Sequence, residues 1–302
     1  MSIEVKNVSK FYGEQAALNN VSFKINSGEI VGFLGPNGAG KSTIMKIITC
    51  FLTKSEGEVK VCGLDVESDS LEIRSKVGYL PEHNPLYLDM YIKEYLDFVA
   101  GIYKIKNKKE RIAEMISLVG LDKEQNKKIG ALSKGYRQRV GLAQAMIHNP
   151  EVLILDEPTT GLDPNQLVEI RQLIMDIGKT KTVMLSTHIM QEVEAICDRV
   201  IIIKDGKIVA DDTTAHIQQS DSEAQTVFVE FDVEISRTKL RQISGVSSVK
   251  HLENNQWLFE SKEEDVRVNI SKYAQQNNLL VLTMRIEEKS MEEVFKELTK
   301  NK

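Results

Sequence analysis

The sequence has few cysteines, no long apolar run and little excess charge. Its three cysteines, Cys50, Cys62 and Cys197, are widely spaced and no pair has metal-ligand spacing, so we expect free thiols in a reducing compartment. No apolar run approaches the ~20 residues that a membrane-spanning helix needs, and residues 1–10 lack the apolar core of a signal peptide. We therefore expect any role at a membrane to depend on a partner protein.

The charge balance also excludes an overall basic surface. The formal net charge is −5, so no general positive field would attract nucleic acid or anionic lipid, and we expect no nucleic-acid partner. Hydrophobic residues make up 41% and charged residues 27% of the chain, which is an ordinary balance for a globular protein. A chain of 302 residues is long enough for two domains.

Strand and helix patterns alternate along the first 210 residues. Alternating apolar positions near the start, at 3–8 and 21–25, predict half-buried antiparallel strands. Mainly apolar runs at 30–34, 152–155, 182–186 and 200–203 predict buried strands, and helical patterns lie between several of them. This order is typical of an α/β domain with a parallel core sheet, here preceded by an antiparallel N-terminal β-subdomain.

Two further regions depart from this α/β order. Three apolar stripes with helical spacing follow one another within residues 91–147, which predicts an inserted helical subdomain over about 83–147 of a domain spanning 1–215. Polar residues from 211 to 225 are typical of a linker. The pattern strand, helix, strand, strand, helix, strand then predicts a small α+β ferredoxin-like domain over 226–302, ending in an amphipathic helix.

A glycine-rich loop follows the apolar run at 30–34 and matches G-x-x-x-x-G-K-[ST] over residues 35–42. Glycines let backbone N–H groups surround phosphate oxygens, and the helix that follows directs its positive end at the same anion. We expect Lys41 to reach the β- and γ-phosphates and the Ser42 hydroxyl to bind Mg²⁺. The loop predicts binding of nucleotide phosphates through Gly35, Pro36, Asn37, Gly38, Ala39, Gly40, Lys41, Ser42 and Thr43.

An acidic pair ends the apolar run at 152–155. Asp156 is placed where a carboxylate at the end of a buried strand can hold Mg²⁺, directly or through water. Glu157 follows directly and can polarise a water molecule that attacks phosphate. The pair therefore predicts a hydrolytic site rather than a solvated loop.

With further motifs added in order, residues 1–210 resemble the ABC ATPases. Tyr12 in Lys-Phe-Tyr-Gly matches the aromatic residue that stacks on adenine in that family. Ser133 and Gly135 occupy the phosphate-contacting positions of the family's signature motif, and residues 160–163 resemble the D-loop that communicates between subunits. His188 resembles the switch histidine that senses the γ-phosphate. The resemblance thus implies catalytic roles for Glu157, His188 and Lys41.

The chain departs from the family pattern at three positions. The signature is usually Leu-Ser-Gly-Gly-Gln, whereas here Lys134 replaces a glycine and Tyr136 replaces the glutamine. The family usually has glutamine at a position that contacts Mg²⁺ and the attacking water, and here it is Glu82. A carboxylate can bind Mg²⁺, so we expect Ser42, Asp156 and Glu82 as metal ligands.

The resemblance also implies an assembly. Two ATP-binding subunits, in a homodimer or a heterodimer, hold ATP between the phosphate loop of one and the signature of the other, and hydrolysis separates them. Integral membrane permease subunits receive this motion, which would place the chain at the cytoplasmic face of the inner membrane. The apolar loop at residues 85–90 is a candidate docking face for a permease helix; its alternative is packing within the helical subdomain.

Other classes of ABC ATPase are alternatives to a transporter subunit. Ribosome-associated members usually carry two cassettes, DNA-repair members carry a long coiled-coil insertion, and regulatory modules bind ATP without hydrolysis. The chain has a single phosphate loop, which argues against the ribosome-associated class, and Lys41 and Leu132 are too close in sequence for the coiled-coil insertion of the DNA-repair class. The presence of Glu157 and His188 argues against a module that does not hydrolyse ATP. The C-terminal region, with its ending at 286–298, resembles exporter subunits, and the full chain most resembles the gliding-motility branch.

Overall fold

The computed structural model describes residues 1–220, 225–261, 265–287 and 290–300. The chain forms two compact units, each with its own apolar core. Unit 1 consists of Met1–Thr214 with Phe295–Lys302, and unit 2 consists of Ala215–Val294. None of the described helices combines the length and the hydropathy needed to cross a membrane.

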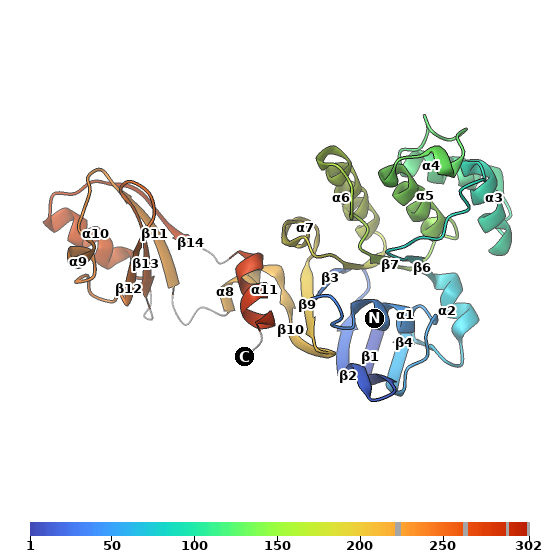
Figure 1. Cartoon of the computed structure of the whole chain (residues 1–302), viewed down its shortest axis with the longest axis horizontal. Coiled ribbons are helices and arrows are strands. Elements are labelled where there is room, and N and C mark those ends of the chain that lie inside the picture. Colours follow the sequence, from blue (N-terminus) through green and yellow to red (C-terminus); the bar gives the residue numbers. More distant parts are fainter. Residues whose placement is uncertain (221–224, 262–264, 288–289, 301–302) are drawn as a thin grey trace. The chain divides into compact units, whose positions relative to one another are not determined.

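A six-stranded sheet forms the centre of unit 1 (Figure 1). Its strands pair in parallel except β10, which runs antiparallel to β9 at one edge. Every residue of β3, β7 and β8 is buried, as expected for parallel strands covered on both faces, and this confirms the predicted parallel core. The sheet order is β10 (Lys207–Thr213), β9 (Arg199–Lys204), β3 (Ile30–Leu34), β8 (Thr182–Ser186), β7 (Val152–Asp156) and β6 (Val77–Leu80).

A second sheet in unit 1 is antiparallel and confirms the predicted N-terminal β-subdomain. Its strands alternate buried and exposed residues because one face covers the core and the other meets solvent. Tyr12 lies at the end of β1 and pairs with Gln15 across the turn to β2. The sheet order is β2 (Gln15–Ile25), β1 (Ile3–Tyr12), β4 (Glu56–Val61) and β5 (Leu64–Asp65).

The helices that were predicted for unit 1 form in their expected places. α1 (Lys41–Ile48) directly follows the glycine-rich loop, and α6 (Pro164–Gly178) begins at Asp163, whose carboxylate accepts hydrogen bonds from two backbone N–H groups. The helical subdomain lies between β6 and β7, as Figure 1 shows in green. It contains α3 (Ile92–Ile102), α4 (Lys108–Leu118), the 3₁₀ turn η1 (Ile129–Ala131) and α5 (Lys134–Met146).

Three short helices were not predicted: α2 (Ser70–Lys76), α7 (Met190–Ile196) and α8 (Thr214–Ser220). Each has seven residues, too few for an apolar stripe to repeat clearly. The linker prediction for 211–225 is wrong over most of its length, because β10 continues to Thr213 and α8 follows. The acidic Asp211 is accommodated in β10 since its carboxylate accepts hydrogen bonds of 2.7 and 2.8 Å from Arg199.

Unit 2 contains the predicted strand and helix order, in an all-antiparallel sheet ordered β12-β13-β11-β14. Two helices accompany the sheet, and this is the ferredoxin-like arrangement. In α11 (Met291–Thr299), expected in the C-terminal domain, the residues from Phe295 group with unit 1, where Lys204 Nζ donates to the Lys300 carbonyl at 2.6 Å. The other elements are β11 (Gln225–Phe231), α9 (Arg237–Leu240), β12 (Ser248–His251), β13 (Gln256–Ser261), α10 (Arg267–Gln276) and β14 (Val281–Glu287).

Candidate nucleotide site

The loop between β3 and α1 leaves the start of the helix open to a ligand. Gly40 occupies the N-cap position with φ of 110°, and no side chain caps the first backbone N–H groups of α1. A Cβ on Gly40 would lie 2.6 Å from the Ala17 carbonyl oxygen, so both the backbone angle and the available space require glycine here. Uncapped N–H groups at a helix start form a site for an anion such as phosphate.

Lys41 lies across this loop. Its Nζ donates hydrogen bonds to the carbonyl oxygens of Gly35 at 2.6 Å and Pro36 at 3.2 Å, and the residue is 9% exposed. Burial lowers the pKa of Lys41, while the negative charges of Glu157, Asp156 and Glu82 act in the opposite direction. The cation is thus held at the loop with three carboxylates near it, in a position to share its hydrogen bonds with a phosphate.

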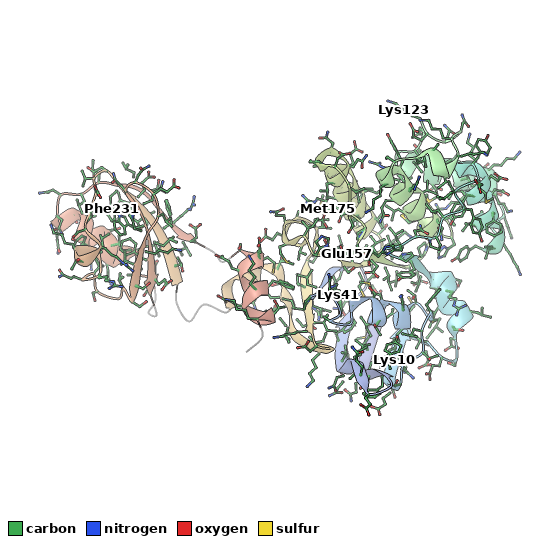
Figure 2. The ribbon with its side chains drawn as sticks, viewed as in Figure 1. Lys10, Lys41, Lys123, Glu157, Met175 and Phe231 are labelled. Atoms are coloured by element: carbon green, nitrogen blue, oxygen red, sulfur yellow. The ribbon has the colours of Figure 1, made fainter. Side chains whose placement is uncertain are left out.

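Lys41 and Glu157 lie near each other in the middle of unit 1 (Figure 2), at a cleft of about 560 Å³. The cleft combines the phosphate loop with the ends of β6, β7 and β8, because parallel strands present their carboxyl ends at one edge of the sheet. Its lining consists of Asn37, Gly38, Gly40, Lys41, Ser42, Thr43, Glu82, Asp156, Glu157, Thr160 and His188. Most of the predicted site residues are therefore brought together.

Asp156 ends β7 and is oriented by the neighbouring strand. Ser186, at the end of β8, donates its hydroxyl hydrogen to Asp156 Oδ1 at 2.6 Å, and Asp156 is only 3% exposed. The Ser186 Oγ atom also accepts a hydrogen bond of 3.0 Å from the backbone N–H of Glu157. One hydroxyl therefore fixes both members of the acidic pair, and Ser186 was not predicted as a site residue.

Ser186→Ala tests this role. The variant should raise the Mg²⁺ concentration required for half-maximal ATP hydrolysis by up to about tenfold, because groups that orient metal ligands commonly contribute an effect of this order. The measurement is a Mg²⁺ titration at saturating ATP. Thr182→Val, which removes a buried hydroxyl at the opposite end of β8, serves as the control. An unchanged Mg²⁺ requirement for Ser186→Ala would contradict the assignment.

Glu157 has the left-handed backbone conformation, with φ of 53°. For a residue other than glycine this conformation costs about 1–2 kcal/mol, and hydrogen bonds from its N–H to Ser186 hold it there. Its Oε2 atom lies 2.7 Å from Nδ1 of His188 and accepts a hydrogen bond of 3.1 Å from the Thr160 hydroxyl. The side chain of Glu157 is 12% exposed and that of His188 is 62% exposed, so the pair borders the open side of the cleft.

The predicted magnesium ligands have suitable chemistry and a common location. Mg²⁺ prefers oxygen donors and usually retains water and substrate phosphates as further ligands. The Ser42 hydroxyl and the Asp156 and Glu82 carboxylates line one cleft. Asp156 is buried and already oriented, whereas the Glu82 side chain is 47% exposed and has no fixed partner closer than His83 Nδ1 at 3.9 Å in the described residues. These residues fit a hydrated Mg²⁺ bound together with phosphate.

Six predicted nucleotide-binding residues do not line this cleft: Gly35, Pro36 and Ala39 of the phosphate loop itself, and Tyr12, Ser133 and Gly135 outside that loop. Tyr12 is 52% exposed, and Lys10 Nζ lies 5.3 Å from the centre of its ring. Ser133 caps α5, where its hydroxyl accepts a hydrogen bond of 3.4 Å from the Tyr136 N–H. These positions leave Tyr12 free for adenine and the signature free for a second subunit, and both roles stay predictions.

The unusual Lys134 lies against residues 160–163. A Cβ added to Gly161 would collide with Lys134 Nζ, and one added to Gly135 would collide with the Gln166 side chain. The signature and the D-loop of one chain are thus in close contact. The Lys134 and Gln166 side chains are flexible and could move aside, so space alone does not require glycine at 135 or 161. At 161 the backbone φ of 77° favours glycine.

Comparisons with a family model, with curated proteins and with solved structures all relate this chain to ABC transporter proteins. Residues 18–160 match the family described as ABC transporter. YxlF of Bacillus subtilis (strain 168), an ABC transporter ATP-binding protein, is 32% identical over 97% of this chain and 98% of its own length. The bacitracin transport ATP-binding protein BcrA of Bacillus licheniformis is 31% identical over 98% of this chain and 96% of its own. The dimeric cassette MJ0796 with ADP and Pi bound is 30% identical, with a TM-score of 0.64 over 70% of this chain and 98% of that one. The chain therefore belongs to the family of ABC transporter ATP-binding proteins.

Proposed function

We propose that this ATPase is the nucleotide-binding subunit of an exporter-type ABC transporter and that binding and hydrolysis of ATP drive transport by separate membrane subunits. The observation that supports this proposal best is the Glu157–His188 pair, 2.7 Å apart, in the same cleft as Lys41 and Asp156. A protein that only binds nucleotide has no need for a carboxylate held in a strained backbone conformation beside the phosphate loop.

In this proposal, each charged group in the cleft has a task. Lys41 and the N–H groups at the start of α1 bind the β- and γ-phosphates of ATP, and Lys41 neutralises charge that develops during transfer. Glu157 orients the attacking water and accepts its proton. His188 holds the Glu157 carboxylate and contacts the γ-phosphate. Ser42, Asp156 and Glu82 would hold Mg²⁺, which would stabilise the negative charge of the phosphates.

A second ATP-binding subunit, identical or related, completes the site. Ser133 and Gly135 lie outside the cleft of their own chain, and the N-terminus of α5 that they form suits phosphate of a nucleotide bound to another subunit. The MJ0796 cassette, at 30% identity to this chain, is a dimer in its state with ADP and Pi bound. These observations support a dimer that closes on ATP and opens after hydrolysis.

Our proposals for the membrane partners and for the direction of transport are based on similarity to other proteins. BcrA, similar over nearly the whole chain, is described as a bacitracin transport ATP-binding protein, which supports a role in transport. We propose that this transport is export through integral membrane permease subunits. Such a partner would hold this chain at the cytoplasmic face of the inner membrane. A narrower assignment to gliding-motility exporters rests on the overall sequence resemblance alone.

The docking face for a permease is proposed at residues 85–90. Tyr87 is 54% and Leu88 is 48% exposed, although the Tyr87 ring also contacts Tyr95 and Phe98 of α3 at centroid distances of 5.9 and 5.8 Å. The segment therefore packs partly against the helical subdomain and is partly exposed. Its apolar residues can thus serve both packing within the subdomain and docking to a permease. Leu88 is better suited than Tyr87 to a test of docking, because the Tyr87 ring packs on Tyr95 and Phe98 and its replacement would also disturb folding.

Leu88→Glu should reduce recovery of the membrane subunits with the tagged chain at least about tenfold, because an unpaired charge is unfavourable in an apolar contact. ATP hydrolysis by the isolated chain should stay within twofold of wild type. The assay is co-purification from detergent-solubilised membranes. Leu71→Glu, at an apolar residue of α2 that is 80% exposed, is the matched control. Normal recovery of the membrane subunits with Leu88→Glu would remove residues 85–90 from the interface.

The same preparation tests the function itself. The wild-type chain should co-purify with integral membrane proteins, and these should increase its ATP hydrolysis in vesicles. Co-purification with ribosomes or DNA, and none with membrane proteins, would refute the transporter role.

A further inference from the structure

A buried glutamate outside the cleft contacts both segments that carry the Glu157–His188 pair. Glu192 lies on α7 and is 0% exposed. Its Oε2 atom accepts a hydrogen bond of 2.7 Å from the Thr159 hydroxyl and another of 2.8 Å from the Thr187 hydroxyl. Both threonines are buried as well, at 2% and 0% exposure.

Through the two threonines, Glu192 is connected indirectly to Glu157 and His188. Thr159 is two residues after Glu157 and precedes Thr160, whose hydroxyl donates to the Glu157 carboxylate. Thr187 directly precedes His188, and its Oγ1 atom also accepts the Ile189 N–H at 3.1 Å. A single carboxylate oxygen therefore ties the segment after β7 to the segment after β8, 33 and 5 residues away along the chain.

Glu192 is poorly suited to a role in stability alone. Its nearest cation is Arg171 on α6, with 4.0 Å between NH2 and Oε1, and in the described part of the chain neither Oε1 nor Arg171 Nε has a hydrogen-bond partner. A buried ion pair with incomplete hydrogen bonding seldom stabilises more than an apolar pair of similar size. An acceptor of two hydroxyl hydrogens at one fixed point, by contrast, determines geometry.

We infer that Glu192 is a positioning residue for ATP hydrolysis: it holds the segments 157–160 and 187–188 as one unit, so that Glu157 and His188 reach the γ-phosphate together. This inference rests on the proposed roles of Glu157 and His188. Glu192 is not part of the phosphate loop and does not line the cleft. Its loss should therefore impair turnover rather than binding of ATP.

Valine substitutions at the threonines test the inference with little change in shape. Thr159→Val and Thr187→Val should each lower kcat about tenfold, the order of effect common for residues that orient a reacting group, and leave KM for ATP within twofold. The double variant should resemble each single variant, because both hydroxyls act through one carboxylate. Thr182→Val is the matched control and should keep wild-type kcat, because Thr182 is a buried threonine at the start of β8, the end opposite Thr187. Losses that multiply, or an equal loss in Thr182→Val, would overturn the inference.

Glu192 itself is tested with two variants. Glu192→Gln keeps an oxygen that can accept both hydroxyl hydrogens and should retain most of kcat, whereas Glu192→Ala should lose at least about tenfold. If Glu192→Ala fails to fold, as thermal unfolding would show, the threonine variants and Glu192→Gln still decide the matter. Wild-type kcat in folded Glu192→Ala, or an equal loss in Glu192→Gln, would refute positioning by the two hydrogen bonds.

A double-mutant cycle that combines Glu192→Ala with Glu157→Gln distinguishes failure of this inference from failure of the proposed function. Once Glu157 no longer accepts the proton, loss of Glu192 should reduce the remaining hydrolysis less than twofold, because it acts through Glu157 and His188. A further tenfold loss in the double variant would assign Glu192 a general structural role and overturn the inference alone. Unchanged hydrolysis in Glu157→Gln alone would refute the proposed catalytic site as well.

Discussion

Glu157→Gln is expected to lower kcat for ATP hydrolysis by about 10²–10⁴-fold, the usual contribution of a positioned general base. Glutamine keeps the size of the side chain and an oxygen that can accept hydrogen bonds from His188 and Thr160, but it cannot take a proton from the attacking water. Affinity for ATP should change little because Lys41 and the start of α1 are intact. The measurement is steady-state phosphate release at saturating MgATP, with ATP affinity determined separately.

Glu72→Gln provides the control for this prediction. Glu72 is an exposed carboxylate in the first turn of α2 and does not line the cleft, so its replacement should leave kcat unchanged. A kcat within threefold of wild type in Glu157→Gln would exclude Glu157 as the base. Another group, such as the Glu82 carboxylate in the same cleft, would then have to activate the water.

The second large effect is expected for Lys41→Ala, which should raise the Kd for ATP roughly 10–100-fold, since a hydrogen bond to a charged group contributes about 1.5–3 kcal/mol. The variant removes a buried cation beside three carboxylates, and it leaves the carbonyl oxygens of Gly35 and Pro36 without their donor. Both changes disfavour a phosphate in the loop. Binding of a fluorescent ATP analogue, followed by competition with ATP, measures the effect.

Lys46→Ala is the matched control for Lys41→Ala, because Lys46 lies on the same helix with an exposed side chain and no place in the cleft lining. Its Kd for ATP should stay within twofold of wild type. Equal affinity in Lys41→Ala and wild type would mean that the glycine-rich loop does not bind the phosphates.

Features encoded in short, continuous segments could be predicted from the sequence. The phosphate loop needs only glycines of the right spacing between a buried strand and a helix, and the structure places residues 35–42 as expected. The parallel core was predictable because β3, β7 and β8 are mainly apolar. The ferredoxin-like order of unit 2 followed from alternating patterns in the same way.

Features that depend on contacts between distant segments could not be predicted. The hydrogen bond from Ser186 to Asp156 needs β7 and β8 to be neighbours in register, and the sequence does not reveal their pairing. A serine at the end of an apolar run carries no distinctive signal. Thr160 is distinguished in the sequence only as part of the D-loop, although its hydroxyl reaches Glu157.

Glu192 shows the same limit more strongly. It lies in a seven-residue helix with no clear apolar stripe, and an isolated glutamate there is ordinarily a solvated residue. Only the folded chain shows that its carboxylate is buried between Thr159 and Thr187. Buried polar groups of this kind are set by tertiary packing, which periodicity does not report.

The central claim is that two ATP-binding subunits close on MgATP and that hydrolysis reopens them. For two copies of this chain, the most direct test is the mass of Glu157→Gln in solution by light scattering. The variant should be a dimer at saturating MgATP and a monomer without nucleotide or with ADP, and Glu157→Gln combined with Lys41→Ala should stay monomeric throughout. A monomer of Glu157→Gln that has demonstrably bound MgATP, in the presence or absence of its membrane partner, would contradict the account.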